Sequence, residues 1–240
     1  MSAIDRRGAL VRRWCLILLL VGAPVHQALA ADGVVAAFGE GNAMPPVLAH
    51  RALHASLGHQ WVSAPARQVL DWIVRSGNNQ DRPFAIVDKV NATVLVFHAD
   101  GRLRGASPAL LGAAIGDDSV PGIGDRAMSS IKPEERTTPA GRFVASIGLN
   151  VHGQTILWVD YDSGIAMHRV VKGQAAERRA ERLASVSLLD KRISFGCINV
   201  PVKFYETVVG PAFTGAGGVV YVLPETRAVD EVFAMHGVEP

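Results

Sequence analysis

The stretch Arg192-Ile193-Ser194-Phe195-Gly196-Cys197-Ile198-Asn199-Val200-Pro201 holds one of only two cysteines in a chain of 240 residues. A serine, a glycine and an asparagine surround the thiol, and a helix is expected to follow. Upstream, His168 ends the apolar run 164–167, which predicts a strand. A cysteine with a distant histidine is the pair that nucleophilic acyl transfer requires. The working hypothesis is that Cys197 is a nucleophile.

The first thirty residues have the three parts of an export signal. Four arginines at positions 6, 7, 12 and 13 precede the apolar run 14–21, and Ala28-Leu29-Ala30 fits the small-residue pattern of a cleavage site. The apolar run is well short of the roughly 20 residues that a transmembrane helix needs. We expect residues 1–30 to be removed as a signal peptide, by the general or the twin-arginine route, with an uncleaved anchor as the alternative. The expected location is the periplasm or cell wall, with no stable membrane anchor.

Removal of this leader changes both the charge and the cysteine content. The whole chain has a formal net charge of +2, and because the leader carries four arginines and one aspartate, the remainder carries −1. That balance does not favour nucleic acid as a partner. Cys15 is lost with the leader, which leaves Cys197 alone. Exported proteins normally pair their cysteines, so a single one indicates a free reactive thiol, an intermolecular bridge or an inert buried side chain.

Residues 31–81 predict a flexible lead-in followed by helices. Ser63 is a suitable N-cap, and Pro65 suits the first helical turn. Apolar residues between 69 and 74 recur at helical spacing before Gly77 ends the helix.

Two histidines in this segment raise the question of a metal. His50 and His54 lie one helical turn apart, a spacing that can hold zinc. No third ligand stands at a useful spacing, and no glycine-rich phosphate loop occurs in the sequence. We therefore expect neither a metal nor a cofactor.

From residue 82 the pattern changes to short apolar and β-branched runs, which predict strands. The runs are 84–88, 93–97, 102–104, 143–147, 156–161, 165–168 and 219–223. We expect a mainly β domain with short helices over residues 82–224, preceded by the small α-helical N-terminal region and followed by a polar tail over 225–240.

Three segments between these runs have other patterns. Residues 116–139 lack periodicity and predict a long loop, which is uncommon in a compact domain unless it is functional or disordered. Residues 174–184 predict a charged, solvated surface helix. Residues 201–209 predict a short helix directly after the cysteine stretch.

A catalytic thiol needs help, because a free one has a pKa near ~8.5 and is only a few per cent thiolate at pH 7. The helix expected near Pro201 would favour a thiolate at its N-terminus. An imidazole is the second source, and His168 is the best-placed candidate because it ends a strand. His98 also ends a strand and His152 lies in a turn, so both stay open as alternatives.

The neighbours of the thiol suggest supporting roles. The backbone amides of Gly196 and Cys197 are suited to bind an oxyanion. Ser194 either orients the imidazole or holds the loop. Asn199 is suited to cap the following helix.

These residues resemble the catalytic signature of the L,D-transpeptidase (YkuD) family: a strand-ending histidine, a spacer, then Ser/Thr-His-Gly-Cys, an apolar residue and Asn or Arg. Further matches are 86–88, 100–101 and 138–143, so the resemblance covers about residues 82–224. It implies a β-rich fold, an exported location and chemistry on peptidoglycan stem peptides. Cys197 would form a thioester that an amine acceptor resolves, and His168 would be the base.

The sequence departs from this signature in two ways. Phe195 stands where the family usually has its second histidine, and the spacer after His168 is longer than usual. A phenyl ring lining the substrate pocket would make it drier and disfavour the thiolate; alternatively, the ring points into the core. Three functions stay open: a transpeptidase, a hydrolase using the same acyl-enzyme (an L,D-carboxypeptidase or one that releases wall-linked proteins), and a wall-binding module whose thiol chemistry has decayed.

Overall fold

The computed structural model describes residues 61–171 and 173–235. The predicted leader, the lead-in and the pair His50 and His54 lie outside these residues. The strands are β1 (Phe84–Asp88), β2 (Thr93–Phe97), β3 (Leu103–Pro108), β4 (Leu111–Gly112), β5 (Gly141–Leu149), β6 (Thr155–Asp160), β7 (Ile165–Arg169), β8 (Arg192–Ser194), β9 (Ile198–Val200) and β10 (Gly218–Val222). The α-helices are α2 (Ala64–Ser76), α3 (Arg179–Ala184), α4 (Val202–Phe204), α5 (Gly210–Phe213) and α6 (Val229–Phe233). Short 3-10 turns are η1 (Ile123–Asp125), η2 (Met128–Ser130), η3 (Pro133–Glu135), η4 (Ala175–Glu177) and η5 (Leu189–Lys191), and η6 (Tyr205–Val209) is a π-helical turn.

Eight strands form one sheet in the order β3-β2-β1-β10-β5-β6-β7-β9. The pairs β1–β10 and β7–β9 are parallel, and the other neighbours are antiparallel. A separate parallel pair joins β4 to β8. The prediction of a mainly β domain with short helices and an N-terminal helix is confirmed.

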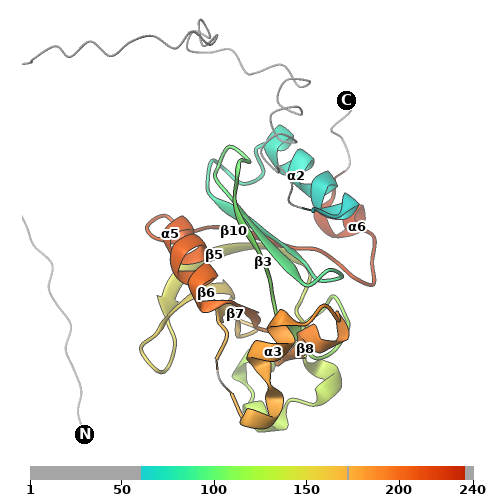
Figure 1. The fold of residues 1–240 in the computed structure, drawn as a ribbon. Helices are drawn as coiled ribbons and strands as arrows, with labels where there is room; N and C mark the ends of the chain where they lie inside the picture. The colour runs from blue at the N-terminus through green and yellow to red at the C-terminus, as the bar shows by residue number, and fades with distance from the viewer. Residues whose placement is uncertain (1–60, 172, 236–240) are drawn as a thin grey trace, which may run out of the picture. The chain divides into compact units, whose positions relative to one another are not determined.

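The central strands are buried on both faces because helices cover each side. Every residue of β1 and β10 is buried. Successive residues alternate between two cores: Phe84 and Ile86 pack with α2 and α6, whereas Ala85 and Val87 pack with α4, η6 and α5. In Figure 1, α2 and α6 lie together on one face of the sheet, and α5 lies on the other. This double burial explains why these strands read as continuous apolar runs.

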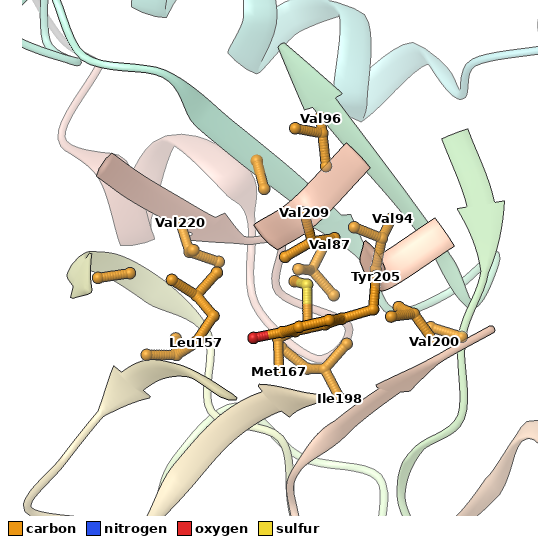
Figure 2. Packing of buried hydrophobic residues seen from close by; sticks show 14 of the residues in the cluster. Val87, Val94, Val96, Leu157, Met167, Ile198, Val200, Tyr205, Val209 and Val220 are labelled. Carbon is orange, nitrogen blue, oxygen red and sulfur yellow. The ribbon is translucent and has the colours of Figure 1, made fainter. Parts of the chain in front are cut away.

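Tyr205 of η6 lies at the centre of the second core. Figure 2 shows its ring among the side chains of Val94, Leu157, Met167 and Ile198. Its hydroxyl is buried without a hydrogen-bond partner. Burial raises the pKa of Tyr205, and the positive charge of the nearby Arg169 guanidinium opposes this. The segment after the cysteine is thereby anchored in the sheet by packing.

The helix α2 begins and ends at the caps that the sequence predicts. Ser63 accepts a hydrogen bond from the Ala66 amide, and Gly77 ends the helix in the left-handed conformation. Its buried face shares a core with β1, β2 and β10, and Phe233 of α6 joins that core. The boundaries placed at residues 82 and 225 from sequence therefore divide segments that share one core. Among residues 61–171 and 173–235, no helix is long and apolar enough to cross a membrane.

The long loop between β4 and β5 contains η1, η2 and η3 and is anchored by a buried ion cluster. The ammonium of Lys89 has no exposed surface, and it donates to Asp117 Oδ1 at 2.7 Å and to the carbonyls of Gly116 and Thr138 at 2.6 and 2.9 Å. Glu225 lies 3.5 Å from the same ammonium. Because every contact joins distant parts of the chain, the cluster fixes this loop against β1 and the C-terminal segment.

Asp117 is the most heavily hydrogen-bonded carboxylate of the cluster. It accepts from the amides of Glu225, Thr226 and Arg227 at 2.8, 2.8 and 2.9 Å, and from the Thr226 hydroxyl at 2.5 Å. Burial alone would raise the pKa of Asp117, but the bonds from Lys89, Thr226 and the backbone hold it well below its usual range. The carboxylate therefore stabilises the fold above its ordinary pKa of about 4, and this stabilisation is lost as the pH falls toward the lower folded value.

We expect Asp117→Asn to lower the free energy of unfolding at neutral pH by about 3–5 kcal/mol, because it leaves the Lys89 charge buried with a poorer partner. Urea unfolding measures this directly. The difference from wild type should shrink below about pH 4, where Asp117 of the unfolded chain becomes protonated while the folded carboxylate is still charged.

The matched control is Asp118→Asn. The Asp118 side chain is 80% exposed and pairs with Arg227 at the surface, so its loss should change stability by less than about 1 kcal/mol. Equal losses in the two variants would contradict this account of the cluster.

Candidate functional site

The pairing of β7 with β9 brings His168 next to the cysteine segment. In this parallel register Met167 pairs with Ile198 and His168 pairs with Asn199. Met167 points into the core, so His168 points to the opposite face of the sheet, because side chains alternate along a strand. Cys197 directly precedes β9, and both Cys197 and His168 line one cavity of about 600 Å³.

The cavity is mainly apolar and has some polar groups in its lining. Its lining includes Met128, Ile156, Trp158, Ala166, Val170, Val171 and Val202. Trp158 also borders a neighbouring hollow with Tyr161, and the two rings meet edge to face at 4.9 Å between centroids. Such a cavity suits a ligand with both apolar and polar parts.

The backbone fixes the tautomer of His168. Its Nδ1 lies 2.7 Å from the Arg169 carbonyl oxygen. A carbonyl only accepts, so Nδ1 carries the hydrogen and Nε2 carries the lone pair. Burial lowers the pKa of His168, the Arg169 hydrogen bond opposes this, and the Arg179 charge lowers it further. The imidazole is therefore neutral at pH 7 and able to accept a proton.

Of the other two histidines considered from sequence, His152 lines the same cavity and His98 does not. Two of the three candidates thus line the cavity that Cys197 also lines. His168 alone among them stands on a strand that pairs with β9.

The Cys197 thiol is partly exposed, and it is the free cysteine of the described residues. Its sulfur lies 3.6 Å from the Gly164 carbonyl. Burial raises the pKa of Cys197, while the Ala166 amide and the Arg179 charge lower it. Because burial has the largest effect, the resting pair is a neutral thiol and a neutral imidazole.

Ser194 and Thr138 hold the cysteine loop. Ser194 Oγ donates to the Cys197 carbonyl at 2.6 Å and accepts from the Gly196 amide at 3.1 Å. Thr138 Oγ1 donates to the Gly196 carbonyl at 2.8 Å. Of the two roles considered for Ser194, the structure places it in the loop-holding one. The Gly196 amide, predicted to bind an oxyanion, is occupied by Ser194 in this state.

Glycine is required at position 196. Its φ is +126°, and a Cβ there would lie 2.6 Å from both the Thr137 carbonyl oxygen and the Ile165 side chain. Any side chain would therefore displace the cysteine loop from its supports.

Asn199 does not cap a helix. It lies within β9, fully buried, and its Nδ2 donates to the Cys197 carbonyl at 3.2 Å. The predicted helix begins at Val202, with Pro201 at its N-cap and no side-chain cap. Strand pairing with β7 prevails over local capping preference here, and the expected interaction of the thiol with this helix stays a prediction.

Phe195 does not line the cavity that holds Cys197 and His168. Its ring is partly buried and lies beneath the Arg136 guanidinium, 3.9 Å from ring centroid to Cζ. Arg136 in turn donates to the Ile131 carbonyl. The ring thus supports the long loop, and its predicted place in a substrate pocket has no counterpart in this cavity.

Sequence reasoning missed Arg179. The charged segment expected to be a solvated helix is divided into η4 and α3, and Arg179 is 11% exposed. Its Nη1 donates to Asn199 Oδ1 at 2.9 Å. The longer spacer after His168 was the one signal that this segment has a place near the site.

No group of three or more His, Cys, Asp or Glu side chains arranged to hold a metal occurs within the described part of the chain.

Comparison with known proteins gives matches among solved structures. No protein-family model matches the chain, and a search of curated proteins likewise gave no match. The structure is similar to the catalytic domain of an L,D-transpeptidase from E. faecium, with 18% identity, 60% of this chain and 98% of that chain covered, and a TM-score of 0.35. It is also similar to the helical cell shape determining protein Pgp2 from Campylobacter jejuni, with 15% identity, 69% of this chain and 57% of that chain covered, and a TM-score of 0.40. An L,D-transpeptidase from Mycobacterium smegmatis is similar as well, with 16% identity, 59% of this chain and 58% of that chain covered, and a TM-score of 0.33. The chain thus spans little more than half the length of the last two.

The position of Phe195 predicts that Phe195→His leaves the thiol chemistry almost unchanged. An imidazole there would face Arg136 and not the cavity, so the pH midpoint of Cys197 alkylation should move by less than about 0.3 units. Loss of the ring–guanidinium contact should cost about 0.5–1 kcal/mol of stability. Alkylation rates against pH and a melting curve measure both, in a chain carrying Cys15→Ser so that one thiol remains.

Phe195→Leu is the matched control, because it removes the ring without adding a polar group. A clear downward shift of the alkylation midpoint in Phe195→His alone would show that the side chain at 195 reaches the thiol after all.

Proposed function

We propose that this protein is an exported acyltransferase of the L,D-transpeptidase type, with Cys197 as nucleophile and His168 as general base, acting on peptidoglycan stem peptides. The observation that supports this most is the convergence of a free thiol and a tautomer-fixed imidazole on one cavity. The parallel register of β7 and β9 produces that convergence from residues 29 positions apart in sequence.

The first half-reaction forms a thioester. His168 Nε2 takes the thiol proton as the Cys197 sulfur attacks the carbonyl carbon of an amide in the donor peptide. The tetrahedral oxyanion collapses, the C–N bond breaks, and the proton on His168 passes to the leaving amine. Because both resting groups are neutral, proton transfer accompanies attack.

The second half-reaction releases the enzyme. An amine of an acceptor peptide or protein attacks the thioester carbonyl and loses its proton to His168. The C–S bond breaks, the thiolate is reprotonated, and a new amide bond is formed. Water in place of the amine would give hydrolysis, so what reaches the cavity after acylation separates a transferase from a hydrolase.

The proposed location rests on the sequence. The leader has the composition of an export signal, and peptidoglycan lies outside the cytoplasmic membrane. A role in wall biogenesis and cell shape is part of the same proposal. The apolar cavity with its neighbouring aromatic pair is compatible with a stem peptide extended along β6 and β7.

The test is incubation with purified peptidoglycan, followed by separation and mass analysis of the muropeptides. We expect new amide cross-links between stem peptides with wild type and none with Cys197→Ala. His168→Ala should slow acylation by a carbapenem about 10²–10⁴-fold without changing the melting temperature, because a positioned base contributes that much.

His98→Ala is the control, since His98 lies away from the cavity. Release of shortened peptides without new cross-links would identify a hydrolase, and binding without any covalent product would identify a wall-binding module. If His152→Ala, and not His168→Ala, slows acylation, the assignment of the base is wrong.

A further inference from the structure

The charged segment after β7 reaches the site through one arginine. The Arg179 side chain is 11% exposed, whereas that of its neighbour Arg178 is 71% exposed. Arg179 donates through Nε to Glu177 Oε2 at 2.8 Å and through Nη1 to Asn199 Oδ1 at 2.9 Å. The guanidinium is therefore fixed between η4 and β9.

Asn199 links Arg179 to Cys197 by hydrogen bonds. Since Asn199 Oδ1 accepts from the guanidinium, its Nδ2 is directed to the Cys197 carbonyl. That carbonyl also accepts from Ser194. Without Arg179, the Oδ1 acceptor of Asn199 would be left buried and unpaired, and the amide would lose the contact that holds its other end.

The charge of Arg179 acts on both reacting groups. Burial raises the pKa of Cys197, and Arg179 counteracts it; burial lowers the pKa of His168, and Arg179 adds to it. A cation beside the pair thus favours the thiolate and disfavours the imidazolium. The effect on the thiol favours its deprotonation, whereas the effect on His168 keeps the imidazole neutral but makes it a weaker base.

We propose that Arg179 is a positioning residue of the Cys197 site, which sets the Asn199 amide and holds a positive charge beside the thiol. This proposal rests on Cys197 being the nucleophile of the proposed function. The proposal also assigns a role to the longer spacer between His168 and Ser194. This segment supplies a cation in a chain that has phenylalanine, and not histidine, before Gly196.

Within residues 61–171 and 173–235, the following other charged and titratable groups face the site. From β7 come His168 and Arg169, and Arg169 is paired with Glu206. His152 lines the cavity from the turn between β5 and β6. Glu177 is the counter-charge of Arg179, so removing one or the other member of this pair should have opposite effects on the thiol.

The test measures Cys197 alkylation by iodoacetamide from about pH 5 to about pH 10, in the full chain carrying Cys15→Ser. Arg179→Met keeps the side-chain length without charge, so the alkylation midpoint should rise and the rate at pH 7 should fall roughly three- to tenfold. Glu177→Gln removes the counter-charge and should move the midpoint downward. Opposite shifts from the two variants are a signature that loss of packing alone does not give.

Arg178→Met is the matched control, because Arg178 is exposed at the N-cap of α3 and pairs with Glu181 of that helix; its profile should match wild type. A folded Arg179→Met with an unchanged profile, or shifts of the same sign in Arg179→Met and Glu177→Gln, would overturn the proposal. If Arg179→Met does not fold, Arg179→Lys and Glu177→Gln decide it, and the proposal fails unless Glu177→Gln lowers the midpoint. Since the reagent is not a wall peptide, failure here leaves the muropeptide result untouched.

Discussion

The buried ammonium of Lys89 is the contact on which the surroundings of the site depend. It neutralises Asp117, lies near Glu225 and binds two carbonyls at opposite ends of the long loop. Arg192 extends the cluster, since it pairs with Glu225 and donates to the Lys89 carbonyl. A charge removed from water in this way is tolerated only when its partners are complete. The loop is consequently held by ion pairs and hydrogen bonds whose partners, Lys89 and Glu225, lie outside the loop sequence.

This order reaches the cysteine through Thr138. The Thr138 carbonyl binds Lys89, and its hydroxyl donates to the Gly196 carbonyl. On the other side, Ser194 and Asn199 both bind the Cys197 carbonyl. The position of the thiol is thus fixed by neighbours that are themselves held by hydrogen bonds, which is the arrangement that its proposed role as nucleophile requires. The cluster and the site form one hydrogen-bonded support.

Local patterns were readable from the sequence, and long-range ones were not. Ser63 and Gly77 bounded a helix because capping acts within one turn, and the apolar runs gave β1, β2 and β10. The sequence predicts a capping role for Asn199, because pairing with a strand some thirty residues earlier leaves no local signal. The Lys89 cluster joins residues 28 and 108 positions apart. Arg179 lies in a segment whose charge spacing predicts a solvated helix. Its side chain is mostly buried because it binds Asn199 of β9, a contact that the local sequence does not indicate.

The position of β10 in the sheet determines the order in which parts of the sheet can join during folding. This strand, among the last elements of the chain, inserts between β1 and β5 and is parallel to β1. The sheet therefore remains in two unjoined parts until residues 218–222 are available, and the early strands have an open edge until then. Pairing across such a separation makes folding slow. For a chain proposed to leave the cytoplasm, that delay lengthens the time during which the sheet is not yet closed.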